Sequence, residues 1–257
     1  MIAGPTDSKH GARDGRHSED ASTGVGILLG RGPKSSQILV HNMPSCVDPA
    51  PSMLKIFAAP SSVALATLIL LEEVEADYEL HLLDFAKGEQ RESTYQAINP
   101  KGRVPAIVTE DGILTETPAI LVYVAQRYGS SPLIGAHDPF IFAKVQEFNS
   151  YLASTVHVAH AHRFRGSRWA DDPAALEAMK RKVPETMTQS AQLIETDLLK
   201  GPWVHGDAYT VCDPYLFTVG TWLEGDGVDT SALPKILAHR ERMLTRPATQ
   251  AALKRLG

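Results

Sequence analysis

The chain has 257 residues, of which 43% are hydrophobic and 21% are charged, and its formal net charge is -5. This composition is typical of a globular protein with one large domain or two small ones, and the negative charge argues against nucleic acid or an anionic membrane as the partner, because both require a basic surface. The two cysteines, Cys46 and Cys212, exclude a disulfide scaffold, and no apolar run approaches the ~20 residues of a membrane span, so we expect a cytoplasmic protein.

Residues 1–52 differ from the rest of the chain. They are rich in Gly, Ser, Asp, Pro and His, and they show no sustained helical or strand periodicity. We therefore expect a disordered N-terminal extension. Met53 stands where the pattern changes, and it is an alternative candidate for the start of translation.

Residues 53–130 predict a small α/β domain. The segments "MLKIFAA" and "YELHLLDF" alternate like strands, and "SSVALATLILLEEVEA" between them is apolar at helical spacing. The polar stretch "AKGEQRESTYQAINPKG" predicts a loop and a short helix. "VPAIVTEDGILTET" predicts two strands joined at Asp111-Gly112, and "PAILVYVAQRYG" predicts a helix with Pro in its first turn. This order predicts a four-stranded mixed sheet with helices on its faces.

The second half of the chain predicts helices only. Residues 131–138 are turn-rich and predict a linker, and residues 139–257 repeat apolar positions every three or four residues. Pro184 is expected to break or kink the helix predicted from "PAALEAMKRKVPETMTQSAQLIETDLLKG". Cys212 lies in the first turn of another predicted helix and is expected to be a small buried apolar residue.

The segment "IFAAPSSVALAT" predicts a strand, a turn at Pro60 and a helix that opens with Ser61 and Ser62. Such a turn directs hydroxyl groups and free backbone N–H groups toward one point, which suits a bound nucleophile. The alternative is that the two serines only cap the helix.

The segment "NPKGRVPAIV" places Pro105 at the start of a predicted strand, where it has no N–H for the ladder. If the Val104–Pro105 peptide bond is cis, the backbone groups of Val104 turn outward and can pair with an extended peptide. The alternative is a plain turn before an edge strand.

In "LTETPAI", Glu116 and Thr117 lie where a strand ends and a helix begins. Free N–H groups, a hydroxyl and the helix dipole favour a carboxylate there, and the Glu116 carboxylate suits an ammonium group. Together they suit the α-amino-acid end of a ligand. The alternative is that Thr117 only caps the helix, with Pro118 in its first turn.

The combination of "NPKGRVPAI" and "ETPAI" resembles the glutathione-binding site of the glutathione S-transferases. The resemblance extends from Leu54 to the C-terminus, and the ending "GVDTSALPKILAHRERMLTRPATQAAL" is most similar to the bacterial beta class. The segment "GDAYTVCDPYLFTVGTW" resembles the capping box of the family, in which Thr210 caps a helix and Asp213 reaches back to it. The resemblance implies a thioredoxin-like domain that binds glutathione as co-substrate, a helical domain that forms the second-substrate pocket, no metal, and a homodimer.

The same resemblance implies roles for particular residues. Arg103 and Val104, beside Pro105, would contact the cysteinyl part of glutathione through backbone groups. Glu116 and Thr117 would hold the γ-glutamyl part. Lys87, in the "AKGE" loop, is placed to meet a glutathione carboxylate.

One position departs from the family pattern. The cysteine of the beta class falls on Val63, which can donate only its backbone N–H, so a mixed disulfide with glutathione through this site is excluded. The hydroxyls stand one and two residues earlier, and the nu class carries a threonine at the position of Ser61. Ser61 and Ser62 are therefore the candidate catalytic residues, and together with the N–H of Val63 they would stabilise the glutathione thiolate.

The segment "STVHVAHAHRFRGSRW" supplies the candidate second-substrate pocket. His157 and His160 share a helix face, but no third ligand at suitable spacing is evident, so we expect no metal. A histidine at the position of His157 resembles one that lines the beta-class cleft. Phe164 and Trp169, with Arg165 and Arg168, would supply an aromatic wall and positive charge for an aromatic or anionic substrate. The alternative for this stretch is a plain loop between helices.

Three functions follow from these expectations. The leading one is a glutathione-dependent transferase that activates the thiol for attack on small hydrophobic electrophiles, a detoxification reaction. The second is a peroxidase, a disulfide reductase or a lyase that uses the same thiolate. The third is a non-catalytic glutathione-binding or interaction protein, which the valine at position 63 favours. Pocket shape is set by several helices together, so the sequence does not name the electrophile.

Overall fold

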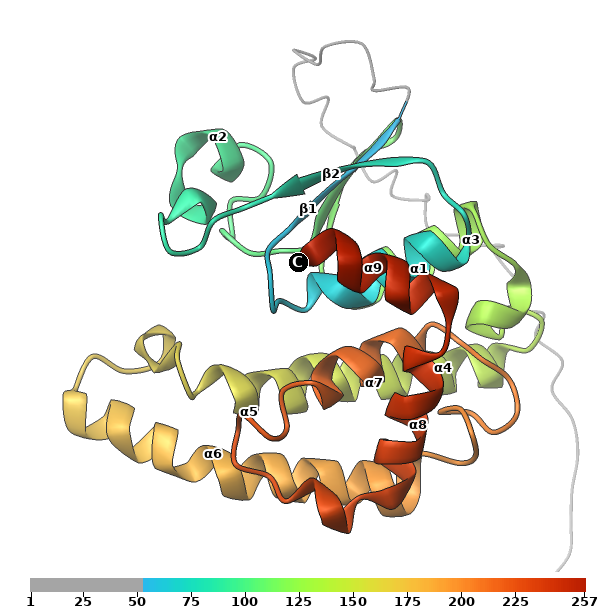
Figure 1. Cartoon of the computed structure of the whole chain (residues 1–257). Helices are drawn as coiled ribbons and strands as arrows, with labels where there is room; N and C mark the ends of the chain where they lie inside the picture. The colour runs from blue at the N-terminus through green and yellow to red at the C-terminus, as the bar shows by residue number, and fades with distance from the viewer. Residues whose placement is uncertain (1–52) are drawn as a thin grey trace, which may run out of the picture. The chain divides into compact units, whose positions relative to one another are not determined.

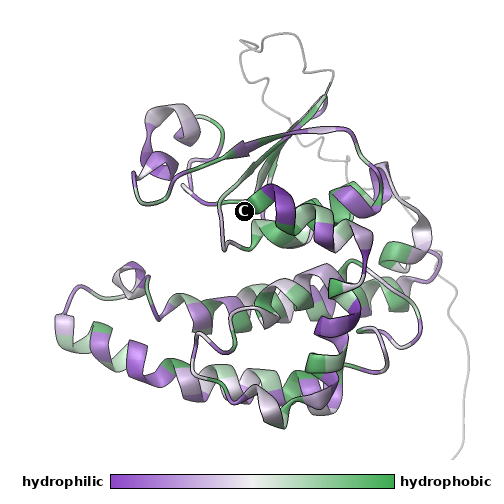
Figure 2. Ribbon diagram, viewed as in Figure 1, coloured by the Kyte–Doolittle hydropathy of each residue, from purple (hydrophilic) through white to green (hydrophobic). Residues whose placement is uncertain are grey.

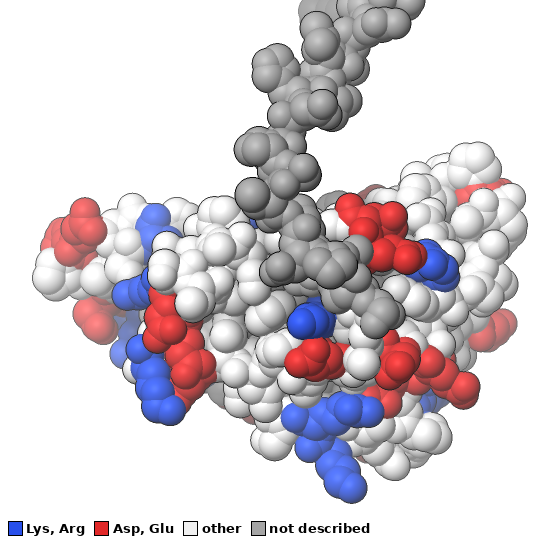
Figure 3. Space-filling model, turned by 90° about the horizontal axis from the view of Figure 1, so that it is seen from above, with Lys and Arg blue, Asp and Glu red and all other residues white. Residues whose placement is uncertain are grey.

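The computed structural model describes residues 53–257. The expected extension, residues 1–52, and Cys46 within it lie outside the described residues. No helix in the described part is both long enough and apolar enough to cross a lipid bilayer. On the face shown in Figure 3, acidic and basic side chains are intermingled.

A four-stranded mixed sheet with the order β2-β1-β3-β4 forms the first domain, here called the sheet domain (Figure 1). β1 runs parallel to β2 and antiparallel to β3, and β3 runs antiparallel to β4. Ile56 lies opposite Leu80 on one side and Ile107 on the other, and Ile56 and Ile107 are fully buried. This is the predicted thioredoxin-like arrangement. Its elements are β1 (Leu54–Ala58), α1 (Ala64–Glu73), β2 (Tyr78–Leu82), α2 (Ser93–Gln96), β3 (Ala106–Thr109), β4 (Gly112–Thr115) and α3 (Thr117–Arg127).

Helices alone form the second part, here called the helical domain, as predicted. Leu152–Val156 is a π-helical turn that joins α4 to α5 in one continuous path. The short turn Ser131–Ile134 lies within the predicted linker, and the domain boundaries at residues 130 and 139 remain predictions. The helices are α4 (Pro139–Tyr151), α5 (His157–Ala161), α6 (Pro173–Leu193), α7 (Cys212–Gly220), α8 (Pro234–Leu244) and α9 (Pro247–Leu256).

Pro184 does not break its helix, which was one of the two effects expected of it. It lies inside α6, which continues from Pro173 to Leu193. An internal proline removes one backbone hydrogen bond, and the rest of this long amphipathic helix still holds the segment helical. The neighbouring Val183 and Met187 are buried, so packing of this face retains the helix around the proline.

Helix α1 is the shared core of the two domains. Every residue from Ala64 to Leu71 is buried, and the helix is apolar almost throughout in Figure 2. It packs against α3 of the sheet domain and against α7 and α9 of the helical domain. A helix that is hydrophobic all round must be covered on all sides. The C-terminal helix therefore returns to the sheet domain, as Figure 1 shows.

The predicted capping box is present at the start of α7. The Asp213 carboxylate accepts from the backbone N–H of Thr210 at 2.7 Å and from that of Val204 at 2.8 Å. The Thr210 hydroxyl accepts from the N–H of Cys212 at 3.3 Å. The Cys212 thiol is fully buried, as expected, and burial raises its pKa well above the ordinary value, so it stays protonated.

Candidate functional site

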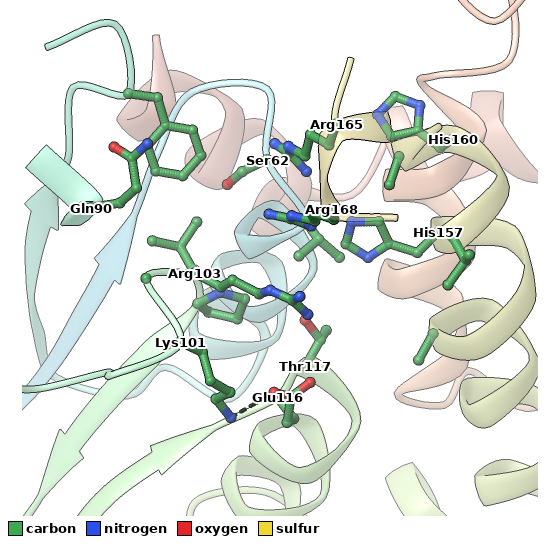
Figure 4. Close-up of a pocket in the computed structure, with 18 of the residues that line it drawn as sticks. Ser62, Gln90, Lys101, Arg103, Glu116, Thr117, His157, His160, Arg165 and Arg168 are labelled. Atoms are coloured by element: carbon green, nitrogen blue, oxygen red, sulfur yellow. Dashed lines mark hydrogen bonds and ion pairs between the residues drawn. The ribbon is translucent and has the colours of Figure 1, made fainter. Parts of the chain in front are cut away.

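A cleft of about 410 Å³ opens between the sheet domain and the helical domain, a size within the usual range for small-molecule sites. The sheet domain contributes the β1–α1 turn, the segment before β3 and the start of α3, and the helical domain contributes α5 and the turn that follows it (Figure 4). All but one of the residues that the sequence proposed for the glutathione site or the second-substrate pocket line this cleft. They are Ser61, Ser62, Val63, Arg103, Val104, Pro105, Glu116, Thr117, His157, His160, Phe164, Arg165, Arg168 and Trp169.

Lys87 is the exception. Its ammonium group pairs with the Asp84 carboxylate at 3.2 Å in the same loop, and the side chain is largely exposed. The expectation that it meets a ligand carboxylate in the cleft is therefore not met by its position. Lys101, Gln90 and Arg91 line the cleft instead. Lys101 belongs to the motif "NPKGRVPAI", so its place in that motif could have indicated that it lines the cleft.

The two adjacent serines of the β1–α1 turn differ in their contacts. The buried Ser62 hydroxyl donates to the Ala59 carbonyl at 2.7 Å and accepts from the Ala64 N–H at 3.3 Å, so it closes the turn. The N-cap residue of α1 is Val63, and no side chain caps this helix. Ser61 is exposed at φ = 55°, and its hydroxyl bonds to no described residue. The N–H of Val63, at the start of α1, is equally without a partner in the described part of the chain.

The Val104–Pro105 peptide bond is cis. The Arg103 carbonyl accepts from the Tyr95 hydroxyl at 2.6 Å and from the Asn99 amide at 2.7 Å, so it is already used. The expected backbone contact of Arg103 with a ligand remains a prediction. Val104 differs, because neither its N–H nor its C=O is hydrogen-bonded within residues 53–257.

The start of α3 presents an acidic group and a hydroxyl. Glu116 has φ = 74°, a strained conformation for a residue with a side chain, and such strain clusters at functional sites. Lys101 Nζ lies 2.6 Å from the Glu116 carboxylate and 2.6 Å from the Thr115 hydroxyl. No side chain caps α3, so the capping alternative for Thr117 is not observed. Its side chain borders the cleft at the helix N-terminus (Figure 4).

The helical wall of the cleft carries two histidines on α5. His160 Nδ1 lies 2.6 Å from the Asp226 carboxylate, which also accepts from Arg163 at 3.2 Å. The His160 ring stacks on Trp222 with centroids 4.2 Å apart. Asp226 is buried and fixes the orientation of the ring. Nothing in the sequence indicated Asp226, because it follows His160 by 66 residues.

His157 stays neutral across the physiological pH range. Its pKa falls to about 4, first because burial disfavours the charged ring. The neighbouring His160, Arg165, Arg168 and Arg103 then disfavour a further positive charge on the ring. Among residues 53–257, no group of three or more His, Cys, Asp or Glu side chains is arranged so that it could hold a metal ion.

Phe164 and Trp169 stand at the rim of the cleft. They are 71% and 49% exposed, so their rings are open to a ligand rather than packed in a core. Arg163 lies over the Phe164 ring at 4.6 Å, and His162 meets Trp169 edge-on at 4.5 Å. Both rings of this loop line the cleft, and their role as a wall for a second substrate remains a prediction.

Comparison with known proteins gives a consistent result. The sequence model described as "Glutathione S-transferase, N-terminal domain" matches residues 52–126. Glutathione S-transferase GstA of Escherichia coli O157:H7 is 32% identical over 206 residues, which are 79% of this chain and 99% of the relative. A glutathione transferase homologue from Sulfitobacter, solved with bound glutathione, is 46% identical with a TM-score of 0.76, over 79% of this chain and 98% of that chain. The beta-class enzyme of Sphingomonas chungbukensis is 29% identical with a TM-score of 0.69, over 79% and 98% of the two chains.

Proposed function

Because the chain belongs to the glutathione S-transferase family, we propose that it binds glutathione in the cleft and activates the thiol for attack on a small electrophile. The observation that carries the proposal is the pair of unused backbone groups on Val104, next to the uncapped N-terminus of α3. An extended tripeptide can pair with the backbone of Val104 and place its α-carboxylate at the N-terminus of α3. Glutathione is such a tripeptide and carries an α-carboxylate.

Each end of glutathione has a partner in this arrangement. The backbone of Val104 pairs with the cysteinyl residue. The Thr117 hydroxyl and the N-terminus of α3 hold the γ-glutamyl carboxylate, and the Glu116 carboxylate meets the γ-glutamyl ammonium group. The glycyl end then runs toward the segment before α2, where Gln90 and Arg91 line the cleft.

Thiol activation follows from the β1–α1 turn. A free thiol has a pKa of about 8.5, so only a small fraction is thiolate at neutral pH. The Ser61 hydroxyl and the Val63 N–H are the uncommitted donors of the turn, whereas the Ser62 proton is directed to the Ala59 carbonyl. Two donors at the N-terminus of α1 stabilise the thiolate, which then attacks the electrophilic carbon or displaces its leaving group.

The other glutathione reactions use the same thiolate. Peroxide reduction, disulfide reduction and lyase chemistry differ from transfer in the second substrate, which the helical wall selects. Val63 supplies no thiol, so each of these reactions uses the sulfur of glutathione alone.

The proposed function is tested by binding glutathione and titrating its thiol by thiolate absorbance. We expect binding with a thiol pKa lowered by about one unit or more from the free value of about 8.5. Binding with an unshifted pKa would establish the non-catalytic alternative. Absence of binding would reject the glutathione site itself.

We also propose that the protein is a cytoplasmic homodimer that detoxifies electrophiles. The start of α4 exposes two large apolar side chains, Phe140 at 72% and Ile141 at 40%, and Tyr128 beyond α3 is also exposed. Exposed apolar groups of this kind suit a subunit interface. Light scattering after size exclusion is expected to give twice the mass of the chain, and Phe140→Asp is expected to give monomers.

A further inference from the structure

Three guanidinium groups converge on the cleft from both domains. Arg103 comes from the segment before β3, and Arg165 and Arg168 come from the turn after α5 (Figure 4). They are close enough to interact, because Arg103 lowers the pKa of both Arg165 and Arg168, although burial contributes more in each case. The arrangement concentrates positive charge at one place in a protein whose net charge is -5.

None of these three arginines forms an ion pair within residues 53–257. Most other arginines in the described part of the chain form ion pairs with acidic side chains. Pairs form between Arg127 and Glu110, Arg163 and Asp226, Arg240 and Glu224, Arg246 and Glu73, and Arg255 and Glu72. Glu116 is the one acidic side chain among the described residues that line the cleft, and Lys101 holds it. The cluster therefore carries positive charge that the chain itself does not neutralise.

Like charges gathered in a partly desolvated cleft cost free energy unless an anion neutralises them. We propose that the second substrate is an electrophile with a carboxylate group, and that Arg165 and Arg168 bind this carboxylate. A guanidinium group matches a planar carboxylate with two parallel hydrogen bonds, which gives the pocket both affinity and orientation. This inference rests on the proposed function, because it assigns the second substrate of the same site.

The carboxylates of glutathione do not account for the whole cluster, although Arg168 also lies near Arg91. In the proposed pose, the γ-glutamyl carboxylate lies at the N-terminus of α3, and the glycyl carboxylate lies near Gln90 and Arg91. Both positions belong to the sheet domain, whereas Arg165 and Arg168 stand on the helical wall. The exposed Trp169 and Phe164 rings stand beside them, so an aromatic carboxylate fits this wall.

The experiment compares two electrophiles, 4-chloro-3,5-dinitrobenzoate and its methyl ester, of which only the first carries a negative charge. Each is assayed with the wild type, Arg165→Gln, Arg168→Gln and the control Arg181→Gln, an exposed arginine of α6 outside the cleft. We expect each cleft substitution to lower kcat/KM for the benzoate about tenfold, the size of one charge-assisted hydrogen bond, and to leave the ester within about twofold. The control is expected to change neither.

Affinities are measured in parallel by calorimetry, with glutathione and with the two dinitrophenyl conjugates. Glutathione is expected to bind the variants as it binds the wild type, and the carboxylated conjugate is expected to lose affinity. Equal losses for benzoate and ester, or weaker glutathione binding in Arg165→Gln and Arg168→Gln, would overturn the assignment while the proposed function stands. A wild type that binds no glutathione would reject the proposed function, and this assignment with it.

Discussion

At the residue scale, the neighbouring hydroxyls of Ser61 and Ser62 differ in their contacts. Ser62 is buried and makes two hydrogen bonds within the turn, whereas Ser61 is exposed and makes none with the described residues. We predict that Ser61→Ala raises the thiol pKa of bound glutathione by about one unit, equivalent to one hydrogen bond of about 1.4 kcal/mol, with little effect on folding. Thiolate absorbance against pH measures the change.

Ser62→Ala is the matched control for that substitution. It removes both bonds of the turn, so the free energy of unfolding is expected to fall by about 1–3 kcal/mol while the thiol pKa stays within about 0.3 units of the wild type. If Ser62→Ala shifts the pKa and Ser61→Ala does not, the roles assigned to the two serines are reversed.

The lowered pKa of His157 predicts that the stability of the protein depends on pH. Its pKa is about 4 in the folded protein, against an ordinary value of 6.5. Below pH 6.5 the unfolded chain takes up a proton at this residue and the folded protein does not, so stability falls as the pH drops toward 4. The full loss is about 3 kcal/mol for a shift of this size, and His157→Gln is expected to remove it.

Urea unfolding at several pH values between 4 and 7 measures this effect. The exposed His137 gives the control, because His137→Gln leaves the burial and the neighbouring arginines of His157 unchanged. A wild type and a His157→Gln variant with parallel stability profiles would show that His157 titrates normally in the folded state.

At the scale of single elements, the start of α7 depends on one carboxylate. Asp213 is completely buried and accepts from two backbone N–H groups, and His239 Nε2 lies 3.0 Å from it. Asp213→Ala leaves these groups without a partner, and we predict a loss of about 3–5 kcal/mol in unfolding free energy. Asp229→Ala, which removes an exposed cap, is expected to cost about 1 kcal/mol or less. Chemical denaturation of both variants tests the contrast.

Elements with a local signature were predicted from the sequence. The hairpin at Asp111-Gly112 and the helix after Pro118 appear where the turn and capping residues indicated, because backbone preferences act over a few residues. The break expected at Pro184 does not occur, because the packing of a long helix outweighs the local effect of the proline.

Contacts between distant segments could not be predicted in this way. The pairing of His160 with Asp226, the use of the Arg103 carbonyl by Tyr95 and the capture of Lys87 by Asp84 depend on side-chain positions in the folded protein. The resemblance to a family indicated which residues meet at the cleft. It did not indicate which of their polar groups remain free for a ligand, and that difference separates Ser61 from Ser62.

At the scale of the whole molecule, α1 connects the two domains. Its residues pack against both domains, and Arg246 at the start of α9 donates from Nε to the Glu73 carboxylate at 3.0 Å while lying 4.1 Å above the Tyr209 ring. We predict a single unfolding transition, because neither domain can bury α1 alone.

The tryptophans make this prediction measurable. All three, Trp169, Trp203 and Trp222, lie in the helical domain, so fluorescence reports on that domain, and amide hydrogen exchange of β1 and β3 reports on the sheet domain. Both probes are expected to give the same midpoint in urea. Arg246→Ala is expected to lower the free energy of unfolding reported by each probe by about 2–3 kcal/mol, because it leaves the partly buried Glu73 without its partner. Glu73→Gln combined with Arg246→Ala is expected to recover part of this loss. Two separate midpoints would show that the domains fold independently and that α1 belongs to one of them alone.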